Sequence, residues 1–211
     1  MKTWLGVALI VPVFAMVMGL KTHRFGWNCV LTLSCAAIAA LTKRGPMMIP
    51  MVVALCLSVI GDYFMAHKGA RTAWYIAGIA GFLLAHAAFI WYAGQRFQGS
   101  PRIWIAGAAL LVMLGLYLVK RVLPHVKVTP MRVAVSLYAL VSIVSVVAAA
   151  GMKGKPLEAL FYTLGIMLIA FSDTMIAEND FVRNKDAFVY IMPSYYLCHI
   201  CVAASAIIGM G

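Results

Sequence analysis

The sequence predicts an all-α integral membrane protein, built as a bundle of eight transmembrane helices in a single domain over residues 1–211. Of the 211 residues, 64% are hydrophobic and 11% are charged, and the mean hydropathy is +0.97. Soluble domains carry about 25% charged residues, so this composition excludes that class. The apolar residues form continuous runs close to the length of about 20 residues that crosses a bilayer. Continuous runs predict helices, because the strands of a membrane barrel alternate apolar and polar residues.

Short linkers rich in charge, proline and glycine separate the apolar runs. Lys43-Arg44-Gly45-Pro46 is typical of them, and none is long enough to fold alone. All five tryptophans lie within a few residues of a predicted span end, where an amphipathic indole prefers the level of the lipid headgroups. On these boundaries we predict spans at residues 4–20, 25–41, 47–66, 72–93, 103–119, 131–150, 157–177 and 187–208.

The net charge of +11 comes from 17 Lys and Arg against 6 Asp and Glu. These basic residues are spread over the linkers, so we interpret them as topology signals and headgroup contacts, and we expect no nucleic-acid partner. The predicted topology places both termini on one side, with seven Lys and Arg there and ten on the other side. By the positive-inside rule, this small bias favours termini outside a cell membrane.

Two short patterns suggest other classes but lack features that those classes need. The first span follows Lys2 like a signal peptide, yet it is longer than the usual apolar region of about 7 to 15 residues and no A-x-A cleavage site follows. Cys198 and Cys201 have CxxC spacing without a second ligand pair, and the cysteines are odd in number and lie in apolar runs. We therefore expect free thiols and no zinc site.

Two aspartates, Asp62 and Asp173, lie inside otherwise apolar spans. An ionisable residue at the centre of a membrane helix costs about 2.5 to 3.5 kcal/mol, so it usually faces the protein interior and marks a site. Both lie about one turn from the end of an odd-numbered span, and odd-numbered spans share a direction. We expect the third, fourth, seventh and eighth spans to surround one polar cavity near a membrane face, with the two carboxyls within about 10 Å, as in paired catalytic carboxyls.

The sequence pattern around these aspartates occurs twice. His86 follows Asp62 after 24 residues, and His199 follows Asp173 after 26 residues. Because the pattern returns after four spans, it predicts a four-plus-four parallel repeat. Each histidine falls in the middle of the returning helix, about 5 to 10 Å deeper than the aspartates.

Helical spacing places further polar and aromatic residues on the same faces as these groups. The residues are Ser58, Phe82, Ser172, Tyr195 and Tyr196. A purely structural interpretation stays open for all of them. The aspartates could be capped by a hydroxyl or a backbone group, a histidine often only bridges two helices, and a tyrosine can pack with its hydroxyl satisfied.

Four short motifs, in the right order and spans, carry a resemblance to a known family. They are Ser58-x-x-Gly61-Asp62, Phe82-Leu83-Leu84-Ala85-His86, Phe171-Ser172-Asp173 followed by Phe181, and Ser194-Tyr195-Tyr196 followed by His199. With these motifs the chain resembles the YhhN-like, or lysoplasmalogenase, family of eight-span membrane proteins. One departure lies in the second span, where family members carry Lys-Pro and this chain has Asn28-Cys29. The resemblance therefore assigns no headgroup contact to that position.

The resemblance implies hydrolysis of the vinyl-ether bond of lysoplasmalogens, with lysophospholipid and membrane lipid as partners. This chemistry requires one protonated carboxyl and one carboxylate, which two carboxyls in a low-dielectric bundle can supply without a metal or cofactor. Asp62 and Asp173 are the predicted catalytic residues, and which is the acid stays open. The predicted substrate-binding or supporting residues are Ser58, Phe82, His86, Ser172, Tyr195, Tyr196 and His199.

Two other functions stay open at this point. Buried acids and a parallel repeat also occur in small-solute or proton-coupled membrane transporters, whose sites tend to lie near the bilayer midplane between broken helices. A metal-dependent membrane lipid hydrolase could use His86, His199 and the two aspartates as ligands, although no HxxxH or H-x-E spacing is present. The depth of the two acids separates the transporter from the hydrolases.

Overall fold

The computed structural model describes residues 2–42, 45–69 and 71–210, and these residues are almost entirely helical, with no strand among them. The α-helices are α1 (Lys2–Ala8), α2 (Ile10–Thr22), α3 (Phe25–Leu41), α4 (Ile49–Ala66), α5 (Thr72–Gly94), α6 (Pro101–Tyr117), α7 (Thr129–Ala150), α8 (Pro156–Ala177) and α9 (Phe188–Ile208). Six helical segments among the described residues are long and apolar enough to cross a membrane, and two shorter apolar helices precede them. The predicted all-α membrane bundle is confirmed.

The helix boundaries follow local sequence signals. Helices α4, α6, α7 and α8 each have a proline in the first turn, where its missing N–H costs nothing. The first predicted span differs from the structure, since it is divided at Leu9 into α1 and α2. Pro12 explains this division, because proline in a helix removes the bond to the carbonyl four residues earlier and clashes with it.

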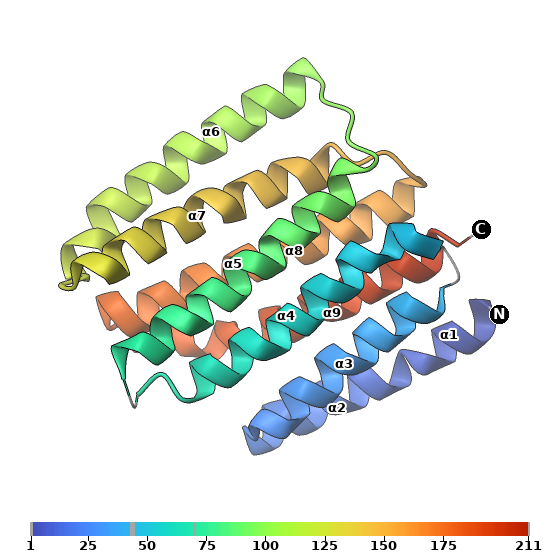
Figure 1. The fold of residues 1–211 in the computed structure, drawn as a ribbon, viewed down its shortest axis with the longest axis horizontal. Coiled ribbons are helices and arrows are strands. Elements are labelled where there is room, and N and C mark those ends of the chain that lie inside the picture. Colours follow the sequence, from blue (N-terminus) through green and yellow to red (C-terminus); the bar gives the residue numbers. More distant parts are fainter. Residues whose placement is uncertain (1, 43–44, 70, 211) are drawn as a thin grey trace.

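The four helices that carry the motifs occupy the centre of the bundle. Figure 1 shows α4, α5, α8 and α9 side by side, with α2 and α3 along one flank and α7 and then α6 along the other. Helix α6 is the outermost and has no buried residue. The first and last helices reach the same end of the bundle, as predicted for termini on one side (Figure 1).

Two central helix pairs approach closely because glycine lies at their contacts. A Cβ atom on Gly81 of α5 would lie 3.0 Å from the Cα atom of Gly61 in α4. A Cβ atom on Gly165 of α8 would lie 2.9 Å from the carbonyl oxygen of Cys198 in α9. Small residues let helix backbones pack directly in a membrane. Each pair carries one aspartate and one histidine of the predicted four-plus-four repeat, and the repeat itself stays a prediction.

We predict that Gly81→Ala destabilises the protein, because the added methyl group meets the backbone of α4. Overpacking of this kind costs about 1 to 3 kcal/mol. Gly115→Ala on α6 is the matched control, since a Cβ atom there has no neighbour within 4 Å and alanine improves helix propensity by up to about 1 kcal/mol. Thermal unfolding of the purified variants in detergent measures both effects. A Gly81→Ala variant as stable as Gly115→Ala would contradict the close contact.

Candidate active site

A cavity of about 310 Å³, which we call the aspartate cavity, lies among α2, α3, α4, α5, α8 and α9. It reaches the polar end of the bundle at His23 and Lys68. It is lined by six of the predicted site residues: Asp62, Phe82, Ser172, Asp173, Tyr195 and Tyr196. The other three, Ser58, His86 and His199, are fully buried behind this lining. The structure thus brings both aspartates to one cavity bordered by all four motif helices, with α2 and α3 added to its wall.

Asp62 lies one turn before the end of α4 and is only 8% exposed. Its Oδ2 atom accepts a hydrogen bond of 2.7 Å from the Tyr195 hydroxyl. Phe82 packs edge-on against the Tyr195 ring at 6.1 Å and holds that ring beside the carboxyl. Among the described residues, no cation lies within ion-pair distance of Asp62. The local partner of this carboxyl is therefore a neutral phenol.

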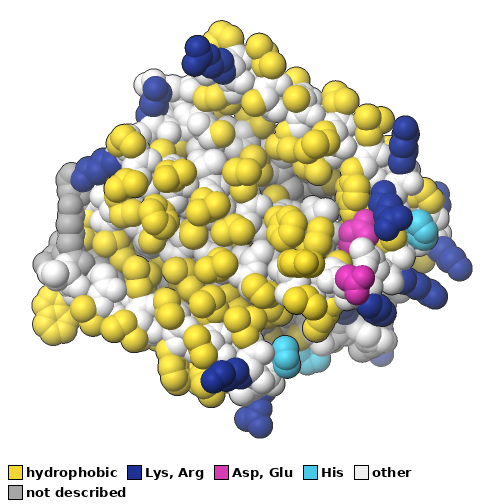
Figure 2. All heavy atoms as spheres, turned by 180° about the vertical axis from the view of Figure 1, so that it is seen from behind, with side chains coloured by type: hydrophobic (Ala, Val, Ile, Leu, Met, Phe, Trp, Pro, Cys, Tyr) yellow, Lys and Arg dark blue, Asp and Glu magenta, His cyan; other side chains and the backbone are white. Residues whose placement is uncertain are grey.

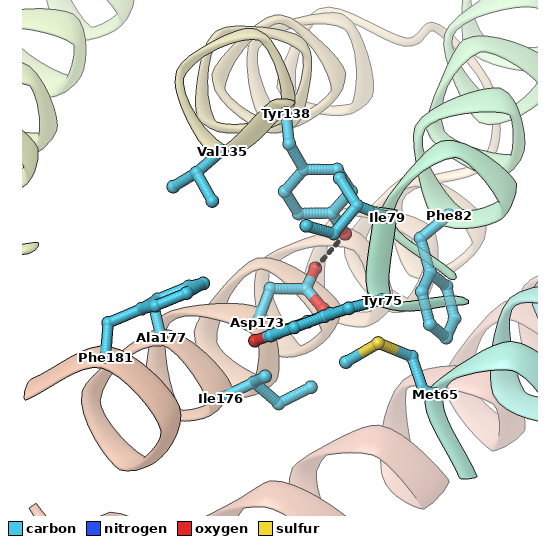
Figure 3. Close-up of a pocket in the computed structure, with 10 residues that line it drawn as sticks. All are labelled: Met65, Tyr75, Ile79, Phe82, Val135, Tyr138, Asp173, Ile176, Ala177 and Phe181. Atoms are coloured by element: carbon cyan, nitrogen blue, oxygen red, sulfur yellow. Dashed lines mark hydrogen bonds between the residues drawn. The ribbon is translucent and has the colours of Figure 1, made fainter. Parts of the chain in front are cut away.

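Asp173 lies one turn before the end of α8 and has different partners. Its Oδ2 atom accepts a hydrogen bond of 2.5 Å from the Tyr138 hydroxyl of α7, which is the dashed line in Figure 3. The same oxygen lies 3.4 Å from Nε2 of His86. A pocket of about 60 Å³ extends from Asp173 toward Tyr75 and Phe181, also drawn in Figure 3. Asp173 thus faces a phenol and an imidazole together.

Both ring nitrogens of His86 have hydrogen-bond partners. The Ser145 hydroxyl donates to the carbonyl of Ser142 at 2.8 Å, so it accepts from Nδ1 of His86, also at 2.8 Å. Nε2 of His86 lies 3.0 Å from the Tyr138 oxygen. The single Tyr138 hydrogen can point either to Asp173 or to His86.

The cluster has more than one complete hydrogen-bond arrangement. If Tyr138 donates to Asp173, Nε2 of His86 can accept from the Ser142 hydroxyl, which lies 3.5 Å away. If Nε2 carries a proton, it can donate to the Tyr138 oxygen, and if the Asp173 carboxyl carries one, Tyr138 can donate to His86 instead. The His86, Tyr138 and Asp173 cluster can therefore take up or pass on a proton beside the cavity.

The sequence pattern that defines the YhhN family matches residues 23–206, from just before α3 almost to the end of α9. The chain belongs to the YhhN family. Comparison with curated proteins and with solved structures gives no significant match.

The YhhN-family match confirms the resemblance expected from the four motifs and includes every residue of the aspartate cavity from His23 onward. The chain is a multi-pass membrane protein of this family, because the match extends over the same apolar helices. The specific reaction is a separate question, and it depends on what the cavity can do chemically.

Several predicted site residues of this YhhN-family protein have structural contacts. The Ser58 hydroxyl donates only to the carbonyl of Ala54 in its own helix, at 3.0 Å. Ser172 donates to the carbonyl of Ile191 at 3.0 Å and so joins α8 to α9. His199 uses Nδ1 to donate to the carbonyl of Tyr195 at 2.8 Å. Nε2 of His199 is buried without a partner in the described part of the chain.

Tyr196 and Asn28 form the wall of the cavity on the side of α2 and α3. The Tyr196 hydroxyl donates to Oδ1 of Asn28 at 2.5 Å, and the Tyr196 ring covers Gly19. Asn28 thus positions Tyr196 at the cavity.

The sequence analysis missed Tyr138, Ser142 and Ser145, which lie in α7 outside the four motifs. They occupy positions i, i+4 and i+7 of an otherwise apolar helix, so they form one polar stripe. That stripe is a signal in the sequence. It indicates that α7 turns a polar face toward the site.

The metal-ligand arrangement expected for a metallohydrolase is not assembled. Within residues 2–42, 45–69 and 71–210, no group of three or more His, Cys, Asp or Glu side chains is placed to hold a metal ion. His86 lies beside Asp173, whereas His199 is hydrogen-bonded to the backbone of its own helix. His86 and Asp173 thus belong to one cluster, and His199 and Asp62 to a second cluster around Tyr195.

Proposed function

We propose that this YhhN-family protein is a membrane hydrolase that cleaves the vinyl-ether bond of lysoplasmalogens and releases a fatty aldehyde and a glycerophospho-base. One observation carries the proposal: two carboxyls with unlike hydrogen-bond partners line a single cavity at one end of a membrane bundle. A lysolipid could place its headgroup at the polar end of this cavity and its chain among the apolar helices. Family membership supports the same reaction class.

The reaction needs an acid and a carboxylate on the same bond. Protonation of the second alkenyl carbon forms an oxocarbenium ion at the first carbon, and water then attacks that first carbon. The resulting hemiacetal collapses when a proton reaches the glycerol oxygen and another leaves the new hydroxyl. Proton transfer by positioned side chains contributes about 10² to 10⁴ in rate, and a carboxylate near the cation adds electrostatic stabilisation.

The unlike partners of the two aspartates support different roles. Among the described residues Asp62 has a phenol donor and no cation within ion-pair distance, which suits a carboxylic acid, because an isolated carboxylate in an apolar site is costly. Asp173 lies beside His86, and an imidazole that takes up a proton there can balance a carboxylate. In this mechanism Asp62 protonates the alkenyl carbon, and Asp173 stabilises the cation and takes a proton from water. Asp173 then protonates the glycerol oxygen, and Asp62 recovers its proton from the hemiacetal.

The depth of Asp62 favours this hydrolase over a transporter. Asp62 lies one turn from the end of α4, whereas transporters tend to bind substrate near the midplane between broken helices. Asp173 lies four residues before the end of α8, which continues as a π-helix over Glu178–Val182. Helices α4, α5 and α8 continue through the site, and α9 contains Pro193 there.

We predict that the purified protein in detergent releases aldehyde from 1-alkenyl lysophospholipids. The matched 1-alkyl lysophospholipids should release none, because a saturated ether has no carbon that a weak acid can protonate. Aldehyde is measured by trapping and mass spectrometry over a panel of ethanolamine and choline lipids. No aldehyde from any alkenyl lipid would contradict the hydrolase and favour the transporter.

We predict that Asp62→Asn and Asp173→Asn each lower turnover by a factor of about 10² or more, in line with the loss of general acid-base catalysis. Folding should survive both changes, since asparagine keeps the shape of the side chain and its amide oxygen can still accept the hydrogen bond from Tyr195 or Tyr138. Turnover and thermal unfolding are measured on the same monodisperse samples. Asp186→Asn is the matched control, because Asp186 is exposed in the connection before α9.

Supporting residues should have smaller effects than the two aspartates. His86→Gln, Tyr138→Phe and Tyr196→Phe each remove a group that orients or balances a carboxyl or shapes the cavity. Activity close to that of the parent in either aspartate variant would remove that residue from the mechanism. Activity of His86→Gln that returns with added metal would favour the metal-dependent hydrolase.

A further inference from the structure

A second cavity, of about 520 Å³, adjoins the aspartate cavity at the same end of the bundle. Three connections line it: the α4–α5 link, the α6–α7 link and the segment after α8. We call it the basic vestibule, after its four cationic residues Lys68, Arg71, Lys127 and Arg183. Lys68 lines both cavities, so it marks the boundary between them. Figure 2 shows Lys, Arg, His and acidic side chains together toward one end of a largely apolar face, with further Lys and Arg side chains at the opposite end.

The charges in the basic vestibule are unbalanced. Asp180 is its single carboxylate among the described lining residues, and it pairs with Lys68 while accepting a hydrogen bond of 2.8 Å from Tyr75. In the described part of the chain, Arg71, Lys127 and Arg183 have no carboxylate within ion-pair distance. Cations brought together from separate segments repel one another, and a bound anion relieves that repulsion.

The backbone at Arg183 gives an independent indication. Arg183 has a φ of 64°, in the left-handed region that glycine usually occupies at a helix end. A residue with a Cβ atom is disfavoured there, because the Cβ atom comes too close to the following carbonyl oxygen. A strained residue that lines a site suggests that its side chain has a function, and here the side chain is one of the four cations.

We infer that the basic vestibule binds the phosphate group of a lipid headgroup, with the lipid chain directed into the aspartate cavity. This inference rests on the proposed function, in which a lysophospholipid occupies that cavity. Arginine forks and lysine ammonium groups are the usual partners of phosphate. Lys68 can exchange Asp180 for the phosphate, because it already borders both cavities.

The wall between the two sites is aromatic. Tyr75 and Phe181 stack at 5.6 Å with their planes 5° apart, and both line the basic vestibule and the small pocket beside Asp173. The Tyr75 hydroxyl is tied to the same Asp180 carboxylate as Lys68. A phosphate that draws Lys68 away from Asp180 therefore changes the contacts of the carboxylate that also accepts the Tyr75 hydrogen bond.

Binding of uncleaved lipids tests the inference separately from hydrolysis. The ligands are a 1-alkyl lysophospholipid and a 1-alkylglycerol of equal chain length, which differ by the phosphate headgroup. Lys68→Gln should weaken binding of the phospholipid by a factor of about 10 or more, as expected for the loss of a charge-assisted hydrogen bond, and leave the alkylglycerol unchanged. Arg71→Gln and Lys127→Gln should act in the same direction. Arg183→Gly should do so with no loss of thermal stability, because glycine suits the left-handed backbone.

Lys120→Gln and Lys185→Gln are matched controls, since both lysines are exposed on connections at the same end of the bundle and outside the basic vestibule. Inorganic phosphate that displaces the phospholipid from the parent, but does not displace the alkylglycerol, supports phosphate as the recognised group. Equal weakening of both lipids, or unchanged phospholipid binding in all four vestibule variants, would overturn the inference. Selective phospholipid binding without aldehyde release would remove the hydrolase and leave the phosphate site standing.

Discussion

Asp62 and Asp173 lie inside a bundle of apolar helices, and each carboxyl must find a hydrogen-bond partner there because lipid offers none. Tyr195 supplies the partner of Asp62 and Tyr138 supplies the partner of Asp173. The first contact joins α9 to α4 at the aspartate cavity, and the second joins the neighbouring helices α7 and α8. Glycine at the close contacts of α4 with α5 and of α8 with α9 holds each aspartate-bearing helix against its partner.

The difference between the two partners matters more for chemistry than their similarity. The hydrogen-bond partner of Asp62 is the phenol of Tyr195, whereas Asp173 shares a hydrogen-bonded cluster with Tyr138 and His86. Two carboxyls with unlike surroundings are the usual basis of an acid and base pair. The basic vestibule lies at the same end of the bundle, and Lys68 lines both it and the aspartate cavity. The proposed phosphate site and the proposed site of proton transfer are therefore adjacent.

Much of the fold could be predicted from the sequence, because continuous apolar runs and first-turn prolines act locally. The aspartates and Tyr195 were found for the same reason, as an intramembrane charge stands out in its own span and helical spacing places its neighbours. The two histidines looked equivalent in the sequence and are not. His86 turns toward α7 and Asp173, while His199 bonds to the backbone of its own helix.

Other features depend on which helices meet, and no local pattern specifies that. Tyr138 belongs to a helix outside the motifs, and only its contact with Asp173 shows its role. The basic vestibule combines residues from three connections whose charges appeared in the sequence as separate topology signals. The division of the first span at Leu9 could have been predicted from the sequence, because proline at position 12 disrupts a helix.

The fate of solvent atoms during turnover tests the central claim most directly. If Asp62 protonates the alkenyl carbon and water attacks the oxocarbenium carbon, hydrolysis in deuterated water places one deuterium on the second carbon of the aldehyde. In water labelled with heavy oxygen, immediate reduction of the aldehyde should trap the label in the fatty alcohol and leave the glycerol product unlabelled. Heavy oxygen in the glycerol product, or an aldehyde without deuterium, would contradict the account.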